Sequence, residues 1–431
     1  MDSIILKKTI KDNNMLKYDF SVSSGLQKFF RSSPYFIEYQ INETPLDLSS
    51  VPLGVLAIPF VCNVLPIIWL TDSKLVLDEL DGNFFKSITD FKKGYIEMYP
   101  EAEFKGKITV KNITEAKPQF SGNSASFFSG GLDAWCTFLR HISENPDLII
   151  LWGADIPYTN EKGWTKLYHN VSKTAKDYNK NLITIKTSFR MVIDDGVLSR
   201  EFTSKLHDGW WHGVQHGIAI IGHAAPCDFL RGVSKQYIAA SFSPEDKNVT
   251  CASYPTIDNK VRFFDCQVFH DAFVTRSQKT KEIVSYRKRT GNQVHLHVCW
   301  ETVDGENCCR CEKCWRTMMG IMLENDYTKY YGFSESKTSF KQMKELLTNN
   351  FDFSQAPYLK VFWKEYKTQF IIRKKQLKNM SYYKYIKWIE KYDFDNPKMS
   401  KKPRFYKIRY RLSEMSFYKN LHKLKSRIKG L

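Results

Sequence analysis

The stretch Phe127-Phe128-Ser129-Gly130-Gly131-Leu132-Asp133 decides the fold of the central part of this chain. It closes an apolar run and opens a pattern of helical period, so it predicts a strand, a tight turn and a helix. The glycines let the backbone turn tightly and expose its N–H groups, and the N-terminus of the next helix favours an anion. The Ser129 hydroxyl adds a donor, and Asp133 can hold a divalent cation bound to phosphate. The stretch therefore predicts a phosphate-binding loop, although two glycines alone also suit an ordinary strand-to-helix turn.

Outward from this stretch, short apolar runs alternate with helical patterns. Such alternation is typical of a parallel sheet sandwiched by helices, so the predicted fold class is α/β and Rossmann-like. The predicted strands are Ala125–Phe128, Leu148–Trp152, Leu182–Lys186 and Gln236–Ser241. The predicted helices are one that ends near Ser143, one near Trp164–Asn179 and one across Trp210–Ala224.

Five of the ten cysteines fall within sixteen residues, 299–314, which read CWETVDGENCCRCEKC. With Cys309 set aside, the candidate ligands are Cys299, Cys308, Cys311 and Cys314, in the pattern C-x8-C-x2-C-x2-C. Four thiolates at short spacings wrap a tetrahedral zinc ion and leave no open position for a substrate, so the predicted site is structural. The spacing also suits an iron–sulfur cluster.

Both motifs resemble those of one superfamily. The glycine-rich stretch is similar to the Ser-Gly-Gly-x-Asp-Ser loop of the N-type ATP pyrophosphatases (PP-loop superfamily), with Ala134 in place of the last Ser. The cysteine spacing is similar to that of the 7-cyano-7-deazaguanine synthases, a branch of this superfamily, and Arg316 follows as it does there. Residues 253–258 (SYPTID) resemble the Gly-Tyr-Pro-type loop between the two motifs. The resemblance covers about residues 124–325 and neither flanking region.

The resemblance implies a fold like that of the adenine nucleotide alpha hydrolases and an ATP-dependent ligase that releases AMP and pyrophosphate. A carboxylate or amide oxygen of a small acid would be adenylated with Mg²⁺, and ammonia or an amine would displace AMP to form a C–N bond. Ser129 and Asp133 are the implied catalytic residues. The implied ATP- and pyrophosphate-binding residues are Phe128, Ser129, Gly130, Gly131, Leu132 and Asp133.

Substrate contacts are predicted outside the two motifs. His212 and His216 share one face of the predicted helix with Gln215 and His223, and they are candidates to line a pocket. Asp258 and Arg262 follow the tyrosine–proline loop and are candidates for polar contacts with the substrate. The charge run before the cysteines is typical of a solvated face, though lysines there could reach a pyrophosphate (Lys279, Lys281, Arg287, Lys288, Arg289). The isolated cysteines are predicted to be small buried hydrophobes (Cys136, Cys227, Cys251, Cys266).

Changes in composition predict three domains. Residues 1–118 form an α+β N-terminal domain, residues 119–335 the ATP-binding domain with its zinc loop, and residues 336–431 a helical, basic and aromatic region. Val51–Leu70 is a run of twenty residues without a charge, which is long enough to span a membrane. Three prolines and Asn63 interrupt the run, so buried strands or short core helices are the preferred interpretation.

The net charge of +18 is concentrated at the C-terminal end. Residues 360–431 hold 22 Lys and Arg against 5 Asp and Glu, a net of +17, so the remaining 359 residues carry only +1. The tail also carries aromatic side chains (Tyr382, Tyr383, Tyr385, Trp388, Phe405, Tyr406 and Tyr410). It therefore fits an anionic membrane surface, RNA or an acidic partner, or a solvated helical appendage.

Two features favour a cytoplasmic protein. The cysteines are clustered, and the apolar run at Ile4–Leu6 is too short for a signal-peptide core. The basic tail would allow peripheral contact with a membrane. Two other functions stay open. A tRNA- or RNA-modifying enzyme of the same superfamily would suit the tail, and a non-catalytic nucleotide-binding paralogue would suit Ala134.

Overall fold

The computed structural model describes residues 1–246, 249–299, 306–334, 337–350 and 357–395. The chain divides into two compact units, Met1–Glu306 and Asn307–Leu431. The three-part division at residues 118 and 335 stays a prediction beside this division into two.

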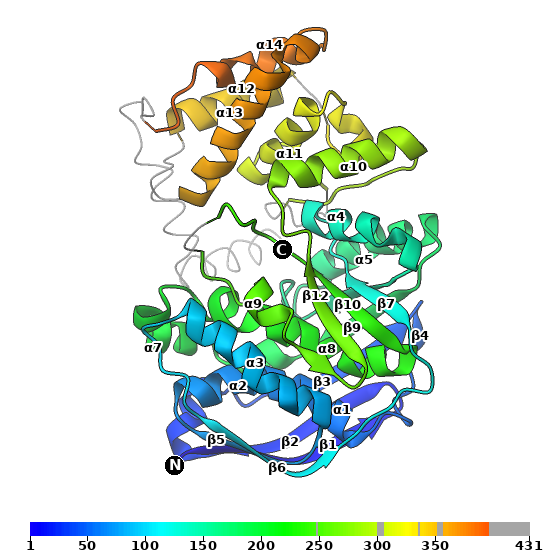
Figure 1. Cartoon of the computed structure of the whole chain (residues 1–431), viewed down its shortest axis with the longest axis vertical. Coiled ribbons are helices and arrows are strands. Elements are labelled where there is room, and N and C mark those ends of the chain that lie inside the picture. The colour runs from blue at the N-terminus through cyan, green and yellow to red at the C-terminus, as the bar shows by residue number, and fades with distance from the viewer. Residues whose placement is uncertain (247–248, 300–305, 335–336, 351–356, 396–431) are drawn as a thin grey trace, which may run out of the picture. The chain divides into compact units, whose positions relative to one another are not determined.

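A single mixed sheet runs through the first unit. Among the described residues it has twelve strands in the order β11-β12-β10-β7-β8-β9-β3-β2-β1-β5-β6, with β4 paired to β3. The α/β class, with a largely parallel sheet flanked by helices, is thereby confirmed (Figure 1). The strands are β1 (Ser3–Asp12), β2 (Met15–Val22), β3 (Tyr35–Ile41), β4 (Thr44–Pro45), β5 (Lys74–Asp81), β6 (Lys107–Thr114), β7 (Asn123–Phe127), β8 (Asp147–Trp152), β9 (Leu182–Thr187), β10 (Val233–Ala239), β11 (Arg262–Phe263) and β12 (Cys266–Asp271).

The centre of this sheet is parallel. Strands β9, β8, β7, β10 and β12 lie side by side, and all four pairings between them are parallel. In chain order this is 3-2-1-4-5, the order of a doubly wound sheet. Most residues of β7, β8 and β9 are buried on both faces, which explains why these segments read as continuous apolar runs. The order reverses between β7 and β10, which are hydrogen-bonded neighbours.

The N-terminal strands extend the same sheet. β3 pairs antiparallel with β9, from Ile37 opposite Thr187 to Ile41 opposite Ile183. β2 and β1 follow as an antiparallel hairpin, and β5 and β6 add parallel strands at that side. Burial alternates at the start of β1, as expected where one face of a sheet meets solvent.

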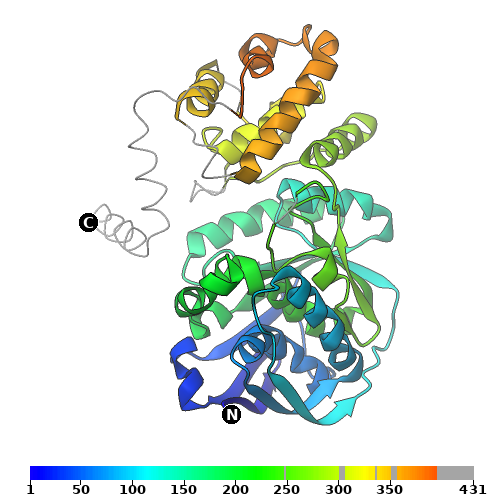
Figure 2. The ribbon, with the colours of Figure 1, turned by 60° about the vertical axis from the view of Figure 1, so that its left-hand side comes forward.

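Helices cover both faces of the sheet (Figures 1 and 2). α4, α5 and α10 lie on one face, where α10 packs on α4, and α2 and α8 pack together on the other. A π-helical turn, Trp211–Gln215, precedes α8. The helices of this unit are α1 (Leu53–Leu56), α2 (Ile58–Leu70), α3 (Gly82–Met98), α4 (Leu132–Arg140), α5 (Glu161–Asp177), α6 (Phe189–Val192), α7 (Asp195–Leu206), α8 (His216–Arg231), α9 (Pro255–Asp258) and α10 (Arg276–Thr290).

The uncharged run Val51–Leu70 forms α1 and α2, so of the two predicted alternatives, buried strands or short core helices, the helices are present. Pro66 lies inside α2 and does not end it. All residues of α2 but the last are buried, and Asn63 is satisfied there by the Tyr35 hydroxyl at 3.0 Å and the Pro59 carbonyl at 2.8 Å. Across the described ranges, no helix has the length and apolarity that crossing a bilayer requires.

The described part of the second unit is helical. It contains α11 (Glu312–Leu323), α12 (Lys337–Glu345), α13 (Pro357–Leu377) and α14 (Tyr383–Ile386). α11 packs on α13, and Trp363 donates a hydrogen bond to Glu312 across this contact at 2.9 Å. Tyr382 is buried and donates to the Met322 carbonyl, so aromatic side chains of this basic region form a core. Phe405, Tyr406 and Tyr410 lie outside the described residues.

One ionisable group of the first unit is buried in an apolar setting. Asp228 on α8 is fully buried, and Gln236 on β10 donates a hydrogen bond to one of its oxygens. Burial raises the pKa of Asp228 well above its usual range. Because the folded-state pKa lies above the unfolded-state pKa, this group supports folding when neutral and loses that contribution as the pH rises.

Asp228→Asn should therefore stabilise the protein at pH 8 by about 1–3 kcal/mol, since an amide removes the buried charge and can still hydrogen-bond to Gln236. The gain should shrink on acidification toward pH 4.5. Urea unfolding at several pH values measures this difference, with exposed Asp19→Asn as the control. A gain of equal size at both pH values would contradict the assignment.

Candidate functional site

The turn between β7 and α4 has the geometry of an anion-binding loop. Gly130 has φ of +74°, a conformation that side chains rarely adopt, and Gly131 caps α4 in extended conformation. Ser129 is exposed at the turn, so its hydroxyl is accessible to a ligand. Phe128 and Leu132 are buried, and the Phe128 ring packs on Trp135 at 5.2 Å between centroids. These two side chains anchor the turn, so only their backbone groups could contact a ligand.

The turn lies at the point where the strand order reverses. In open parallel sheets, ligands bind at the carboxyl ends of the strands where connections leave in opposite directions. Here β7 is followed by residues 128–131, and its neighbour β10 is followed by Ala240. The predicted phosphate loop thus lies at the expected crevice of a doubly wound sheet.

Two buried cations from α10 lie beside Asp133 in the first turn of α4. Lys279, with 1% of its side chain exposed, bonds through Nζ to Asp133 Oδ1 at 2.8 Å and to the carbonyl of Ala240. Arg276 is also buried, and its Nη1 lies 3.9 Å from Asp133 Oδ2. Two cations beside one carboxylate leave an excess positive charge next to the loop, which favours a phosphate. For the charge run that includes Lys279, the sequence left open a solvated face or a contact with pyrophosphate, and Lys279 is buried. Arg276 was missed because periodicity alone does not show which face of α10 turns inward.

The segment before the cysteine cluster lies along the loop. The His297 N–H donates to the Gly130 carbonyl at 2.7 Å, and Trp135 Nε1 donates to the His295 carbonyl at 3.0 Å. Tyr178 holds the start of the segment through the Gln293 carbonyl at 2.7 Å. Cys299 follows His297 by two residues, so the first predicted metal ligand directly continues the segment that supports the phosphate loop.

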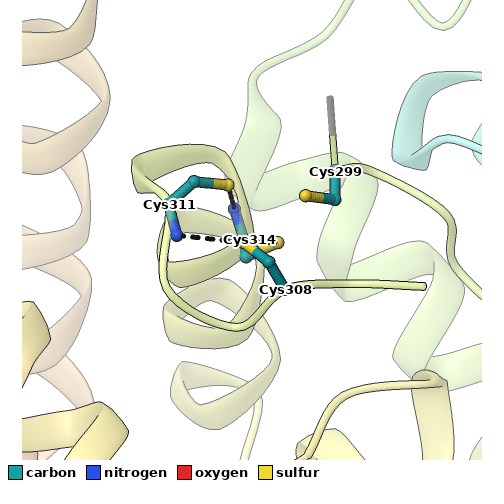
Figure 3. Close-up of side chains that lie close together, drawn as sticks. All are labelled: Cys299, Cys308, Cys311 and Cys314. Carbon is teal, nitrogen blue, oxygen red and sulfur yellow. Dashed lines mark hydrogen bonds between the residues drawn. The ribbon is translucent and has the colours of Figure 1, made fainter. Parts of the chain in front are cut away.

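The four predicted cysteine ligands lie together (Figure 3). Their sulfur atoms are all within 4.8 Å of one another. Cys314 and Cys299 are buried, and Cys308 and Cys311 are partly exposed. The cluster could hold a metal ion such as zinc, as the sequence predicted.

Local structure prepares these thiols as ligands. Cys311 is the N-cap of α11 and Cys314 lies in its first turn, where the helix dipole favours thiolates. Backbone N–H groups donate to the sulfurs, from Cys311 to Cys308 at 3.3 Å and from Cys314 to Cys311 at 3.5 Å (Figure 3). A tetrahedral zinc with Zn–S bonds of ~2.3 Å needs sulfurs ~3.8 Å apart, close to the 3.9 Å between Cys308 and Cys314.

The two predicted substrate histidines, His212 and His216, have different carboxylate partners. His212 lies in the π-helical turn Trp211–Gln215, and His216 follows it. His212 Nδ1 contacts Asp208 at 2.7 Å, whereas His216 lies 3.6 Å from Asp155. His223 is fully buried against Thr187, and burial lowers its pKa to about 4.

The two polar candidates after the tyrosine–proline loop lie in different settings. Asp258 is fully buried and accepts hydrogen bonds from Ser253 at 2.7 Å and from His270 at 2.8 Å, so its carboxylate belongs to a closed polar cluster. Arg262 is exposed and lines a groove of about 500 Å³ together with residues of α3.

The loop glycines allow a matched test. Gly130→Ala should be about 1–2 kcal/mol more destabilising than Gly131→Ala, because only Gly130 has a left-handed φ. A Cβ on Gly131 would meet only ordinary contacts, at 3.5 Å from Ser129 Oγ and 3.8 Å from the His297 carbonyl. Urea unfolding of both variants measures the difference, and equal stabilities would contradict this turn geometry.

We expect the purified protein to hold one zinc ion per chain through the four cysteines, measured by elemental analysis. Cys308→Ser and Cys314→Ser should lose most of it, because a closed site needs all four thiolates. Cys309→Ser is the matched control, since this neighbouring thiol donates to the Asn307 carbonyl and is outside the cluster. Iron with visible absorbance would assign an iron–sulfur cluster instead.

Comparison with known proteins adds no relative: no protein-family model, no curated protein and no solved structure matches this chain.

Proposed function

We propose that this chain is an ATP-dependent, AMP-forming ligase related to the 7-cyano-7-deazaguanine synthases of the PP-loop superfamily. The observation that carries the proposal is the glycine-rich loop at the strand-order reversal, with the buried cations Lys279 and Arg276 beside Asp133. The cysteine cluster supports it, because it continues the segment bonded to Gly130.

ATP would place its phosphates against the exposed N–H groups of the Ser129–Gly131 turn and the N-terminus of α4. Lys279 is already desolvated and held by Asp133, so it can neutralise phosphate charge with little reorganisation. Asp133, with 28% of its side chain exposed, would hold the accompanying Mg²⁺, which supplies further charge neutralisation. Ala134 is buried in the first turn of α4 and supplies no hydroxyl to the phosphates.

The reaction would join an acid and an amine. A carboxylate or amide oxygen attacks the α-phosphorus, pyrophosphate leaves, and ammonia or an amine displaces AMP to form the C–N bond. The fold that this implies is the adenine nucleotide alpha hydrolase-like variant of the doubly wound sheet. Catalysis comes from positioning and charge neutralisation at the loop.

The test is AMP and pyrophosphate formation from α-labelled Mg-ATP with ammonium chloride and the small-molecule fraction of a cell extract. Lys279→Met and Ser129→Ala should each lower the rate about 10- to 100-fold, the effect of losing a hydrogen bond to a charged group. Exposed Lys281→Met on the same helix is the matched control and should retain the full rate.

Two results would each favour a different function. Binding of Mg-ATP without any AMP under these conditions would favour a non-catalytic nucleotide-binding paralogue. AMP formation that requires tRNA in place of the small-molecule fraction would favour an RNA-modifying enzyme.

A further inference from the structure

A histidine at the C-terminal end of α4 lies between two carboxylates from different segments. His141 is the C-cap of α4, and its Nδ1 lies 2.9 Å from Oε1 of Glu144 in the helical turn that follows. Its Nε2 lies 3.4 Å from Oδ1 of Asp271, the last residue of β12. A neutral imidazole carries one N–H and can donate to only one of these carboxylates, whereas an imidazolium can donate to both. The geometry therefore suits a protonated ring.

The charges around this ring balance when it is protonated. Among the described residues, the ionisable groups around it come from α4, the turn after it, β10, β12 and α10 (Arg140, Glu144, Lys235, Tyr237, Asp271, Glu282). Arg140 bonds to Glu282 through two hydrogen bonds of 2.7 Å. Lys235 lies 3.2 Å from Glu144. Two cations thus meet three carboxylates, and a charged His141 makes three of each.

Packing holds the ring and also favours its cationic form. His141 stacks on the Tyr237 ring with centroids 3.7 Å apart, and the Tyr237 hydroxyl donates to the Glu144 carboxylate at 2.9 Å. The face of an aromatic ring and the C-terminus of a helix both attract a cation. Burial alone would lower the pKa of His141, but hydrogen bonds and charge from Asp271 and Glu144 outweigh burial and raise it.

Hydrogen bonds connect this histidine to the glycine-rich loop through Ala240. The Ala240 N–H donates to the Asp271 carbonyl at 2.8 Å, and the Ala240 carbonyl accepts from Lys279. Lys279 also bonds to Asp133 in the first turn of α4. Asp271, which contacts the C-terminal end of α4, and Lys279, which contacts its N-terminal end, are thus bonded to the same residue.

We propose that His141 is a pH sensor that ties the end of α4 to the end of β12. As an imidazolium it bridges Glu144 and Asp271. When the ring loses its proton to solvent, one carboxylate faces an unprotonated nitrogen, so the bridge is lost and Ala240 and Lys279 are held less tightly beside the loop. Because the pKa of His141 is raised, the bridge is complete below the ordinary histidine value of ~6.5 and is lost as the pH rises through the raised value.

Titration of the ring tests the sensor without any ligand. NMR of the full chain labelled with ¹³C-histidine follows the ring signals, and His141→Gln identifies the signal of His141. We expect His141 to titrate above ~6.5, and to titrate at a lower pH in Asp271→Asn and in Glu144→Gln, because each variant removes one carboxylate. A midpoint at or below ~6.5 in the unmodified protein, or an unchanged midpoint in both variants, would overturn the proposal.

Stability as a function of pH tests what the bridge holds. At pH 6 the urea midpoint of the unmodified protein should exceed that of His141→Gln by about 0.2–0.5 M, the effect of one partly exposed ion pair, and the difference should disappear by pH 9. His169→Gln is the matched control, since His169 is exposed, and it should leave the midpoint unchanged at both pH values. Equal midpoints for the unmodified protein and His141→Gln at pH 6 would show that the ring ties nothing together.

Binding of pyrophosphate with Mg²⁺, measured by calorimetry, tests the connection to the loop, and this step alone rests on the proposed function. At pH 6.5 His141→Gln should bind about twofold or more weakly than the unmodified protein, and at pH 9 the two should bind equally. The same ratio of affinities at both pH values would overturn the connection through Ala240. Absence of binding by the unmodified protein would instead overturn the proposed phosphate site, and the titration and urea results would still decide whether His141 is a sensor.

Discussion

The buried ammonium of Lys279 constrains the whole carboxyl edge of the sheet. Removing an ammonium group from water costs several kcal/mol unless charge and hydrogen bonds compensate it. Its side chain is 1% exposed, and its partners are the Asp133 carboxylate on α4 and the carbonyl of Ala240 after β10. Because these three elements must meet for the charge to be satisfied, α10, α4 and β10 are held in one arrangement. A phosphate at the loop would therefore meet a cation that is already desolvated and oriented.

The segment that leads to the first cysteine of the cluster is also bonded to the glycine-rich loop and its neighbouring helices. The segment from Gln293 to Cys299 is bonded to Tyr178, Trp135 and Gly130, which belong to the helices and the loop around the crevice. A metal ion bound by Cys299 would fix the end of this segment, since metal–thiolate bonds contribute directly to folding. Backbone hydrogen bonding at His297 thus connects the segment that ends at the first predicted ligand, Cys299, to the glycine-rich loop.

Features of the structure that depend on short sequence spacings could be predicted from the sequence. The strand–turn–helix at Ser129–Asp133 and the four clustered cysteines depend on short spacings, and both are present. The pairing of β3 with β9 joins residues about 145 positions apart, and no local pattern encodes it. The isolated cysteines Cys136, Cys227, Cys251 and Cys266 are all buried, as the sequence predicted. The two histidines that helical spacing grouped have different carboxylate partners, Asp208 and Asp155, which the spacing alone does not show.

The basic C-terminal region has two parts that differ in charge, residues 360–395 and residues 396–431. In residues 360–395 the aromatic side chains that suggested base stacking are used in packing, as Tyr382 is buried, Tyr383 stacks on Phe370 and Tyr385 stacks on Phe340. This part holds 10 Lys and Arg against 4 Asp and Glu, and some of that charge is paired, as in Lys374–Glu390 at 2.7 Å. Residues 396–431 hold 12 against 1, so most of the excess lies there. A surface that stacks bases needs exposed aromatic rings, so residues 360–395 give little support to nucleic-acid binding. The feature that still favours an anionic partner is the positive charge of the last 36 residues.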